Sequence, residues 1–158
     1  MGLDGKGENI TRRNLLQAAG ALALSATVSL PETATAQTSL PVERLKEALT
    51  SGTIVLDVRA PDERTGPDGK EFDLKCPKCR TIRAPFNHLT DGAFGFDDKN
   101  DALLEKLKQG RPKVVVICRE GIRSAAAAKE LAKRGFGRVY NLEGGMKILP
   151  DEMRSNRR

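Results

Sequence analysis

The residues best suited to chemistry form one short stretch, Cys118-Arg119-Glu120-Gly121-Ile122-Arg123-Ser124. The residues before it, 114–117, are an uninterrupted apolar run of the kind that forms a buried parallel strand. The alanine-rich residues after it, 125–132, favour a helix. Cys118 is therefore predicted in a loop between a strand and a helix. Amide N–H groups and the helix dipole at such a place stabilise an anion, here the cysteine thiolate.

The composition of this loop indicates which anion it handles. Gly121 permits a tight backbone turn, while Arg119 and Arg123 supply fixed positive charge for an anionic substrate. Four residues separate Cys118 from Arg123, and this Cys-x4-Arg pattern with an internal glycine resembles the active loop of the rhodanese family. The related cysteine-dependent phosphatases use a loop one residue longer. Because a persulfide adds only one sulfur, the shorter loop favours sulfur over phosphate. A purely structural buried cysteine is the plain alternative, and the order strand, cysteine, glycine, arginine, helix speaks against it.

Three further segments resemble the same family, in the same order along the chain. The sequence Leu56-Asp57-Val58-Arg59 resembles its first signature, and Glu63 stands where the family usually has a glutamate. Residues 82–87 resemble a degraded His-Ile-Pro-Gly element, and residues 139–146 resemble the closing strand with its double glycine. The resemblance spans about residues 39–149. It implies that Asp57, Arg59 and Glu63 support the structure around the site.

The chain also departs from the family pattern. Arg64 replaces an aromatic residue, Thr81 replaces the histidine, Ala84 replaces a glycine, and no tryptophan follows the double glycine. None of these changes touches the nucleophile.

Strands and helices are predicted to alternate, which is typical of an α/β fold with a parallel sheet flanked by helices. The expected strands are 54–58, 81–83, 114–117 and 139–142. The expected helices are 39–49, with Ser39 as its cap, 100–108 and 124–134. Residues 60–80 are expected to form a polar insertion and 87–99 a loop. One rhodanese-like domain over 37–158 is predicted, with its site at the carboxyl ends of the strands.

The N-terminal residues resemble an export signal. Arg12 and Arg13 precede an uncharged stretch from 14 to 31 that resembles a twin-arginine signal, and small residues lead up to Ala36. We predict that residues 1–36 are a signal peptide cleaved after Ala36. The mature protein is then expected in the periplasm without a stable membrane span. An uncleaved N-terminal anchor is the alternative.

The net charge of +6 bears on the partners. Residues 1–36 contain three basic and three acidic side chains, so their removal leaves this charge unchanged. Export and the lack of interleaved aromatic and basic residues argue against nucleic acid. A small anionic sulfur donor and a thiol or protein acceptor are the expected partners.

The insertion, about residues 64–80, contains a second group of cysteines, Cys76-Pro77-Lys78-Cys79. They are predicted to form a local disulfide or a redox pair. Zinc is disfavoured, because the two cysteines supply only two of the four ligands that a structural site needs. His88 would bring the number to three, which is still one too few. No metal is therefore expected. Because the family's Ile82 element runs close to the active loop, we also hypothesise that Cys76 or Cys79 attacks a Cys118 persulfide.

The resemblance implies a sulfurtransferase reaction without a cofactor. Cys118 would attack the outer sulfur of a donor such as thiosulfate, become a persulfide, and pass that sulfur to an acceptor in a ping-pong reaction. Arg119 and Arg123 would orient the donor, whereas Glu120 would disfavour a dianion. The alternatives are a low-turnover persulfide carrier, or binding module for another exported protein, and, third, a cysteine-dependent phosphatase.

Overall fold

A computed structural model describes residues 37–66, 69–89 and 92–156 of the protein. The predicted signal, residues 1–36, lies outside the described residues. Within those ranges, no helix has both the length and the apolar composition that crossing a membrane requires.

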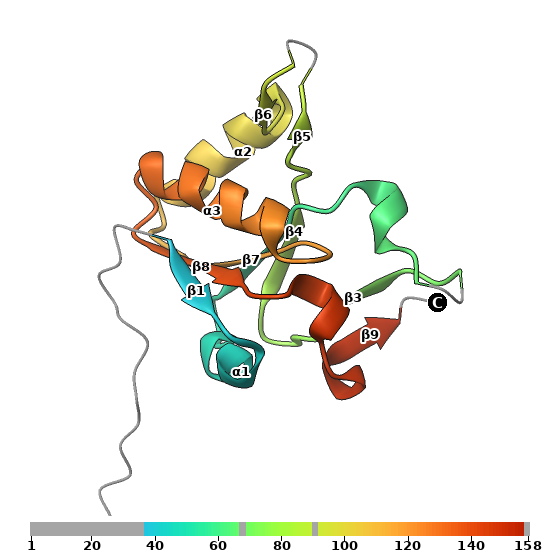
Figure 1. Cartoon of the computed structure of the whole chain (residues 1–158). Coiled ribbons are helices and arrows are strands. Elements are labelled where there is room, and N and C mark those ends of the chain that lie inside the picture. The colour runs from blue at the N-terminus through green and yellow to red at the C-terminus, as the bar shows by residue number, and fades with distance from the viewer. Residues whose placement is uncertain (1–36, 67–68, 90–91, 157–158) are drawn as a thin grey trace, which may run out of the picture.

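A five-stranded parallel sheet forms the centre of the molecule (Figure 1). Its spatial order is β1-β8-β7-β2-β4, and every neighbouring pair is parallel. The strands are β1 (Thr38–Leu40), β2 (Ile54–Asp57), β4 (Arg80–Arg83), β7 (Lys113–Ile117) and β8 (Arg138–Leu142). The predicted α/β fold with a parallel sheet and flanking helices is confirmed.

Helices cover both faces of this sheet (Figure 1). Along β7, Val114 and Val116 point into one core with helices α2 (Asp98–Lys108) and α3 (Ile122–Lys133). Val115 and Ile117 point into the opposite core with helix α1 (Leu45–Ala48). Because every second residue of a strand faces the same side, the continuous apolar run before Cys118 serves both cores.

Two short antiparallel ribbons and four 3-10 helices complete the described part of the chain. One ribbon pairs β3 (Phe72–Leu74) with β9 (Arg154–Asn156), and the other pairs β5 (Asn87–His88) with β6 (Phe94–Gly95). The 3-10 helices are η1 (Val42–Arg44), η2 (Pro61–Arg64), η3 (Gly145–Ile148) and η4 (Asp151–Met153). The segments predicted as loop or insertion thus contain regular structure.

The predicted helix over 39–49 is wrong in its first half. Ser39 lies in β1, opposite Asn141 of β8, and does not cap a helix. Pro41 is extended, and only residues 42–48 are helical. The outer edge of β8 would otherwise leave backbone N–H and C=O groups without partners. Pairing with it also buries Leu40, which is 1% exposed.

The other predicted elements differ mainly at their ends. Helix α2 begins at Asp98, two residues before the predicted start, because the side chain of Asp97 accepts a hydrogen bond from the amide of Asn100. Helix α3 begins at Ile122 and ends at Lys133.

A buried network of charges joins the insertion to the end of β2. The guanidinium of Arg59 donates to Asp57 at 3.0 and 2.8 Å and to the carbonyl of Phe72 at 2.9 Å. It also lies 3.4 Å from Asp73. Arg64, in place of the family's aromatic residue, is buried and donates to the Arg59 carbonyl at 3.1 Å. The insertion is therefore fixed to the sheet by charged groups and not only by apolar contact.

Candidate functional site

The carboxyl ends of the parallel strands meet at one edge of the sheet, and Cys118 lies there, directly after β7. Its thiol is free and its side chain is 3% exposed. The structure confirms the predicted order of strand, loop and helix around Cys118.

Two donors surround the sulfur of Cys118. The amide of Gly121 donates to its Sγ at 3.0 Å, and the hydroxyl of Ser124 lies 3.2 Å from Sγ. The same hydroxyl lies 3.1 Å from the Gly121 carbonyl, so its single proton can serve either acceptor. Gly121 precedes α3 with a φ of 87°, which favours glycine. Donors in this position, at the start of a helix, would stabilise negative charge on the sulfur if it forms.

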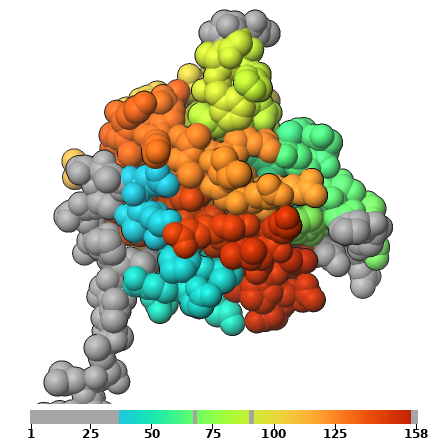
Figure 2. Space-filling model, in the orientation of Figure 1, coloured from blue at the N-terminus to red at the C-terminus, as the bar shows by residue number. Residues whose placement is uncertain are grey.

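The double glycine after β8 fits against this loop. A Cβ on Gly145 would lie 2.5 Å from the Cys118 carbonyl oxygen and 2.6 Å from the Gly121 amide nitrogen. The amide of Met146 donates to the Cys118 carbonyl at 2.8 Å, and that of Lys147 donates to the Arg119 carbonyl at 2.9 Å. Figure 2 shows the surface of this C-terminal segment, in red, directly beside the orange surface around α3. The close approach fixes the backbone of the loop that begins with Cys118.

Arg123 is held by two partners. Its guanidinium forms an ion pair with Glu63 and donates to Asn87 Oδ1 at 3.1 Å. The hydrogen bond from Arg123, assisted by the Ala60 amide, keeps the pKa of Glu63 below its ordinary value. The hydrogen bond to Glu63 in turn raises the pKa of Arg123. The positive charge of Arg123, which was predicted to bind an anionic sulfur donor, is therefore largely shared with the carboxylate of Glu63.

Arg119 and Glu120 lie on the exposed surface of the loop. The carboxylate of Glu120 lies 3.5 Å from the ammonium group of Lys147, which offsets its charge. Within the described ranges, the guanidinium of Arg119 has no hydrogen bond or ion pair to another side chain. Arg119 is thus the arginine of the loop that remains available to a substrate.

A hollow of about 410 Å³ lies over Cys118. Two exposed apolar side chains line this hollow, namely Phe94, which is 45% exposed, and Ile122, which is 77% exposed. In the described part of the chain, the residues that line it are Glu63, Phe94, Cys118, Arg119, Glu120, Ile122, Arg123 and Ala126.

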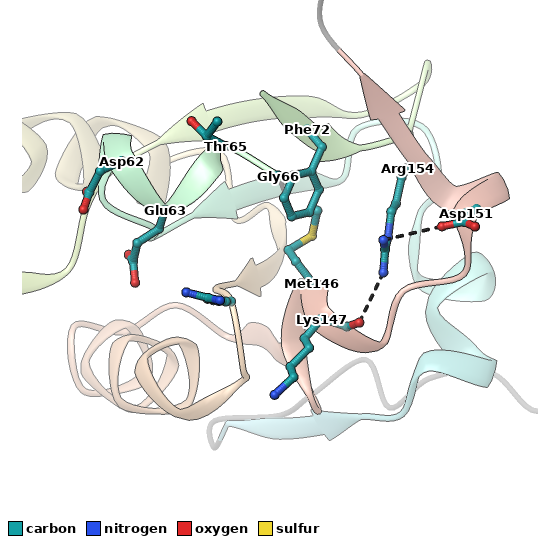
Figure 3. A pocket seen from close by; sticks show the side chains of 10 residues that line it. Asp62, Glu63, Thr65, Gly66, Phe72, Met146, Lys147, Asp151 and Arg154 are labelled. Atoms are coloured by element: carbon teal, nitrogen blue, oxygen red, sulfur yellow. Dashed lines mark hydrogen bonds and ion pairs between the residues drawn. The ribbon is translucent and has the colours of Figure 1, made fainter. Parts of the chain in front are cut away.

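Figure 3 shows the side chains that line a second, larger hollow, which has a volume of about 750 Å³. Glu63 and Arg119 line both hollows and thus form the boundary between them. Phe72 from the insertion and Arg154 from β9 form its far side (Figure 3). Among the described residues, those that line it are Asp62, Glu63, Thr65, Gly66, Phe72, Arg119, Met146, Lys147, Asp151 and Arg154. Asp57 and Arg59 line neither hollow.

Cys76 and Cys79 form a disulfide at the opposite edge of the sheet. Arg80, which follows them, begins β4 and aligns with Ile54 and Val114 at the amino ends of their strands. Cys118 lies four residues beyond Val114 and two strands away, which corresponds to roughly 15 Å. The hypothesis that one of these cysteines attacks a Cys118 persulfide is therefore wrong for this fold.

The proposed third zinc ligand does not join this pair. His88 lies on β5 and packs edge to face against the Phe94 ring, with the centroids 4.7 Å apart. Across the described ranges, no group of three or more histidine, cysteine or acidic side chains could hold a metal ion.

Sequence reasoning did not identify Asn87, Phe94 and Lys147 as parts of this site. Asn87 was visible only as the last residue of the degraded family element. Phe94 and Lys147 are ordinary surface residue types, and nothing local in the sequence indicates that the chain brings them to Cys118.

These features agree with the comparison with known proteins. A model of the rhodanese-like domain matches residues 41–148. The chain therefore belongs to the rhodanese-like domain family.

Individual relatives support this assignment. The chain is 43% identical over 60 residues to "Thiosulfate sulfurtransferase GlpE" of Shewanella oneidensis, covering 37% of this chain and 58% of that protein. It is 29% identical over 123 residues to "Senescence-associated protein DIN1" of Raphanus sativus, covering 76% of this chain and 61% of that protein. The chain thus spans about three fifths of the length of these curated relatives.

The fold is also similar to a solved structure. The crystal structure of Rv0390 from M. tuberculosis has a TM-score of 0.50 and 24% identity, covering 75% of this chain and 86% of that chain. This likeness concerns the fold alone.

Proposed function

We propose that the protein is a sulfurtransferase in which Cys118 carries a sulfane sulfur as a persulfide. The observation that carries the proposal is the position of Cys118 Sγ at the start of α3, where it accepts from the Gly121 amide at 3.0 Å. The name of the Shewanella relative, a thiosulfate sulfurtransferase, supports the same chemistry.

The reaction has two halves. The Cys118 thiolate attacks the outer sulfur of a donor, the donor's S–S bond breaks, and the leaving group departs with the electron pair. An acceptor thiolate then attacks the outer sulfur of the persulfide and Cys118 is released as a thiolate. The amide of Gly121 and the hydroxyl of Ser124 stabilise the sulfur anion in both halves.

The charges around Cys118 bear on the choice of donor. The hollow above it has two basic residues, Arg119 and Arg123, and two acidic residues, Glu63 and Glu120. This balance attracts a dianion such as thiosulfate less than a purely basic cradle would. We infer that a persulfide with lower charge is the better donor, with Arg119 binding its anionic end.

The larger hollow offers space for the acceptor. Its volume of about 750 Å³ lies within the usual range for small-molecule sites. It contains both charged and apolar side chains, among them Phe72 and Met146. An acceptor bound there would reach the persulfide across the boundary formed by Glu63 and Arg119.

A sulfur-transfer assay tests this function. Wild-type protein should form thiocyanate from thiosulfate and cyanide, and mass spectrometry should find a gain of about 32 Da on Cys118 after donor treatment. Cys118→Ser should lose both the turnover and the added mass. Retained transfer in this variant would refute the role of Cys118.

The same measurements separate the alternatives. A persulfide on Cys118 with little turnover to any acceptor would indicate a carrier or a binding module. Hydrolysis of an aryl phosphate that requires Cys118 would indicate a phosphatase, which the Cys-x4-Arg loop length disfavours.

A further inference from the structure

The disulfide between Cys76 and Cys79 has no place in sulfur transfer at Cys118, because it lies at the opposite edge of the sheet. It sits in an exposed turn between β3 and β4, and both cysteines are only half-buried. A disulfide in this position is open to attack by a thiol from solution or from a partner protein.

The turn does not depend on the disulfide for its shape. The Cys79 amide donates to the Cys76 carbonyl at 3.2 Å and closes the turn. The Lys75 amide donates to Met153 at 2.8 Å and the Arg80 amide donates to Thr53 at 3.1 Å, which fixes both ends. Only two residues separate the cysteines, so the cross-link removes little entropy from the unfolded chain. The pair is thus a weak structural staple, and we expect the fold to tolerate its reduced form.

The two sulfurs have different surroundings. Cys76 lines a hollow of about 310 Å³ at this edge, whereas Cys79 packs against the core that contains α1. The Cys79 Sγ lies 4.0 Å from the Thr50 carbonyl oxygen. When the disulfide opens, the S–H of Cys79 therefore has an acceptor nearby, while Cys76 faces the incoming group.

The hollow indicates what kind of partner fits beside Cys76. Leu49, Pro77 and Met153 form an apolar floor. The charged lining residues are three lysines against one glutamate, namely Lys46, Lys75, Lys78 and Glu152. Positive charge attracts an acidic segment and stabilises the thiolates that form during exchange.

We propose that the Cys76–Cys79 disulfide is a thiol–disulfide exchange site that oxidises a two-cysteine segment of an acidic partner protein. A partner thiolate attacks Cys76 Sγ, the disulfide breaks, and Cys79 leaves with the electron pair and takes up a proton. The second partner thiolate then attacks the partner sulfur of the mixed disulfide and releases Cys76. The partner loses two electrons and two protons, and the Cys76–Cys79 pair gains them.

The test uses the full chain with Cys118→Ser, which leaves Cys76 and Cys79 as its only cysteines. The probe is a reduced two-cysteine peptide made in an acidic and a basic version. Opening of the disulfide is followed by alkylation and mass spectrometry. We expect the acidic peptide to open it about tenfold faster at low salt. Lys75→Gln/Lys78→Gln should remove most of this difference, and the control Lys129→Gln/Lys133→Gln, on exposed α3 positions, should not.

Single-cysteine variants test the assigned roles. In the Cys118→Ser background, Cys79→Ser should form a mixed disulfide with an oxidised acidic peptide about tenfold faster than Cys76→Ser does, because only Cys76 lines the hollow. Equal rates would overturn the proposal. Loss of the far-ultraviolet circular dichroism spectrum on reduction, or opening only in denaturant, would also overturn it by showing a structural staple. Because Cys118 is absent throughout, the result is independent of the sulfurtransferase proposal.

Discussion

Glu63 and Arg123 form an ion pair that joins η2, after β2, to the first turn of α3 beside the hollow over Cys118. Their side chains are 20% and 22% exposed, so water screens the pair only in part. The pair positions Arg123 near the sulfur of Cys118 and at the same time reduces the effective charge of that arginine.

This pair predicts a pH dependence of stability. The hydrogen bond from Arg123 lowers the pKa of Glu63 from its ordinary value of 4.5. A lowered pKa means that the contribution is full above the ordinary value and is lost as the pH falls through the lowered one. Glu63→Gln should therefore reduce the free energy of unfolding by about 1 kcal/mol at neutral pH, and by less in acid.

Urea titrations at several pH values measure this difference. Glu47→Gln is the control, because Glu47 forms an ion pair with Arg44 but is 55% exposed, and its loss should change stability little. A Glu63→Gln difference that stays constant from neutral to strongly acidic pH would contradict the assignment.

The close packing of Gly145 predicts a second effect. Gly145→Ala places a Cβ 2.5 Å from the Cys118 carbonyl oxygen at a φ of 60°, so the loop that begins with Cys118 must move. We expect a loss of about 1–3 kcal/mol in stability and slower persulfide formation at Cys118. Gly137→Ala is the control, because a Cβ there meets no atom within 4 Å. Equal effects of the two substitutions on loading would show that the approach of Gly145 does not matter.

The contrast between these two contacts shows what the sequence could predict. The order of strand, Cys118, Gly121 and helix lies within a few residues, so local patterns were enough to place Cys118 between β7 and α3. The partner of Arg123 is 60 residues away, and only the assembled sheet brings it near. Glu63 was expected as structural support, but its pairing with the loop arginine had no local signal.

The same reason explains the error at the N-terminal edge. Ser39 was predicted to cap a helix that runs to about residue 49, but the free edge of β8 determines the structure of Ser39 and its neighbours. Local propensity cannot predict pairing with a strand about one hundred residues later. The charged contacts that fix the insertion, such as Arg59 with Asp73, join residues only 14 apart, but they too form only once the chain has folded and have no local pattern.

Ser124 supplies the third prediction. Its hydroxyl lies 3.2 Å from Cys118 Sγ and is fully buried. Ser124→Ala removes one of the two donors near the sulfur anion and should slow persulfide formation by about tenfold. Stopped-flow or quenched mass spectrometry measures the loading rate. Ser51→Ala, in an exposed turn, should leave it unchanged. An unaltered rate in Ser124→Ala would mean that the hydroxyl bonds only to the Gly121 carbonyl.

Glu120 supplies the fourth prediction. Its exposed carboxylate lines the hollow over Cys118 and is only partly offset by Lys147, at 3.5 Å. Glu120→Gln should raise kcat/KM for thiosulfate about threefold at low salt, and the gain should shrink as salt screens the charge. Glu105→Gln, an exposed change on α2, is the matched control. No gain with thiosulfate would show that Glu120 does not oppose the donor.

The last prediction concerns export. We propose that Arg12 and Arg13 direct the chain through twin-arginine transport, that cleavage follows Ala36, and that the mature domain works in the periplasm. Arg12→Lys/Arg13→Lys keeps the charge but should retain the full-length protein in the cytoplasm, because the signal is read by a receptor and not by charge alone. Cell fractionation and N-terminal sequencing measure both steps. Lys6→Arg, outside the arginine pair, should leave export unchanged. A mature protein that appears in the periplasm despite the double substitution would contradict this route, and an exported chain that keeps residues 1–36 would indicate an uncleaved anchor.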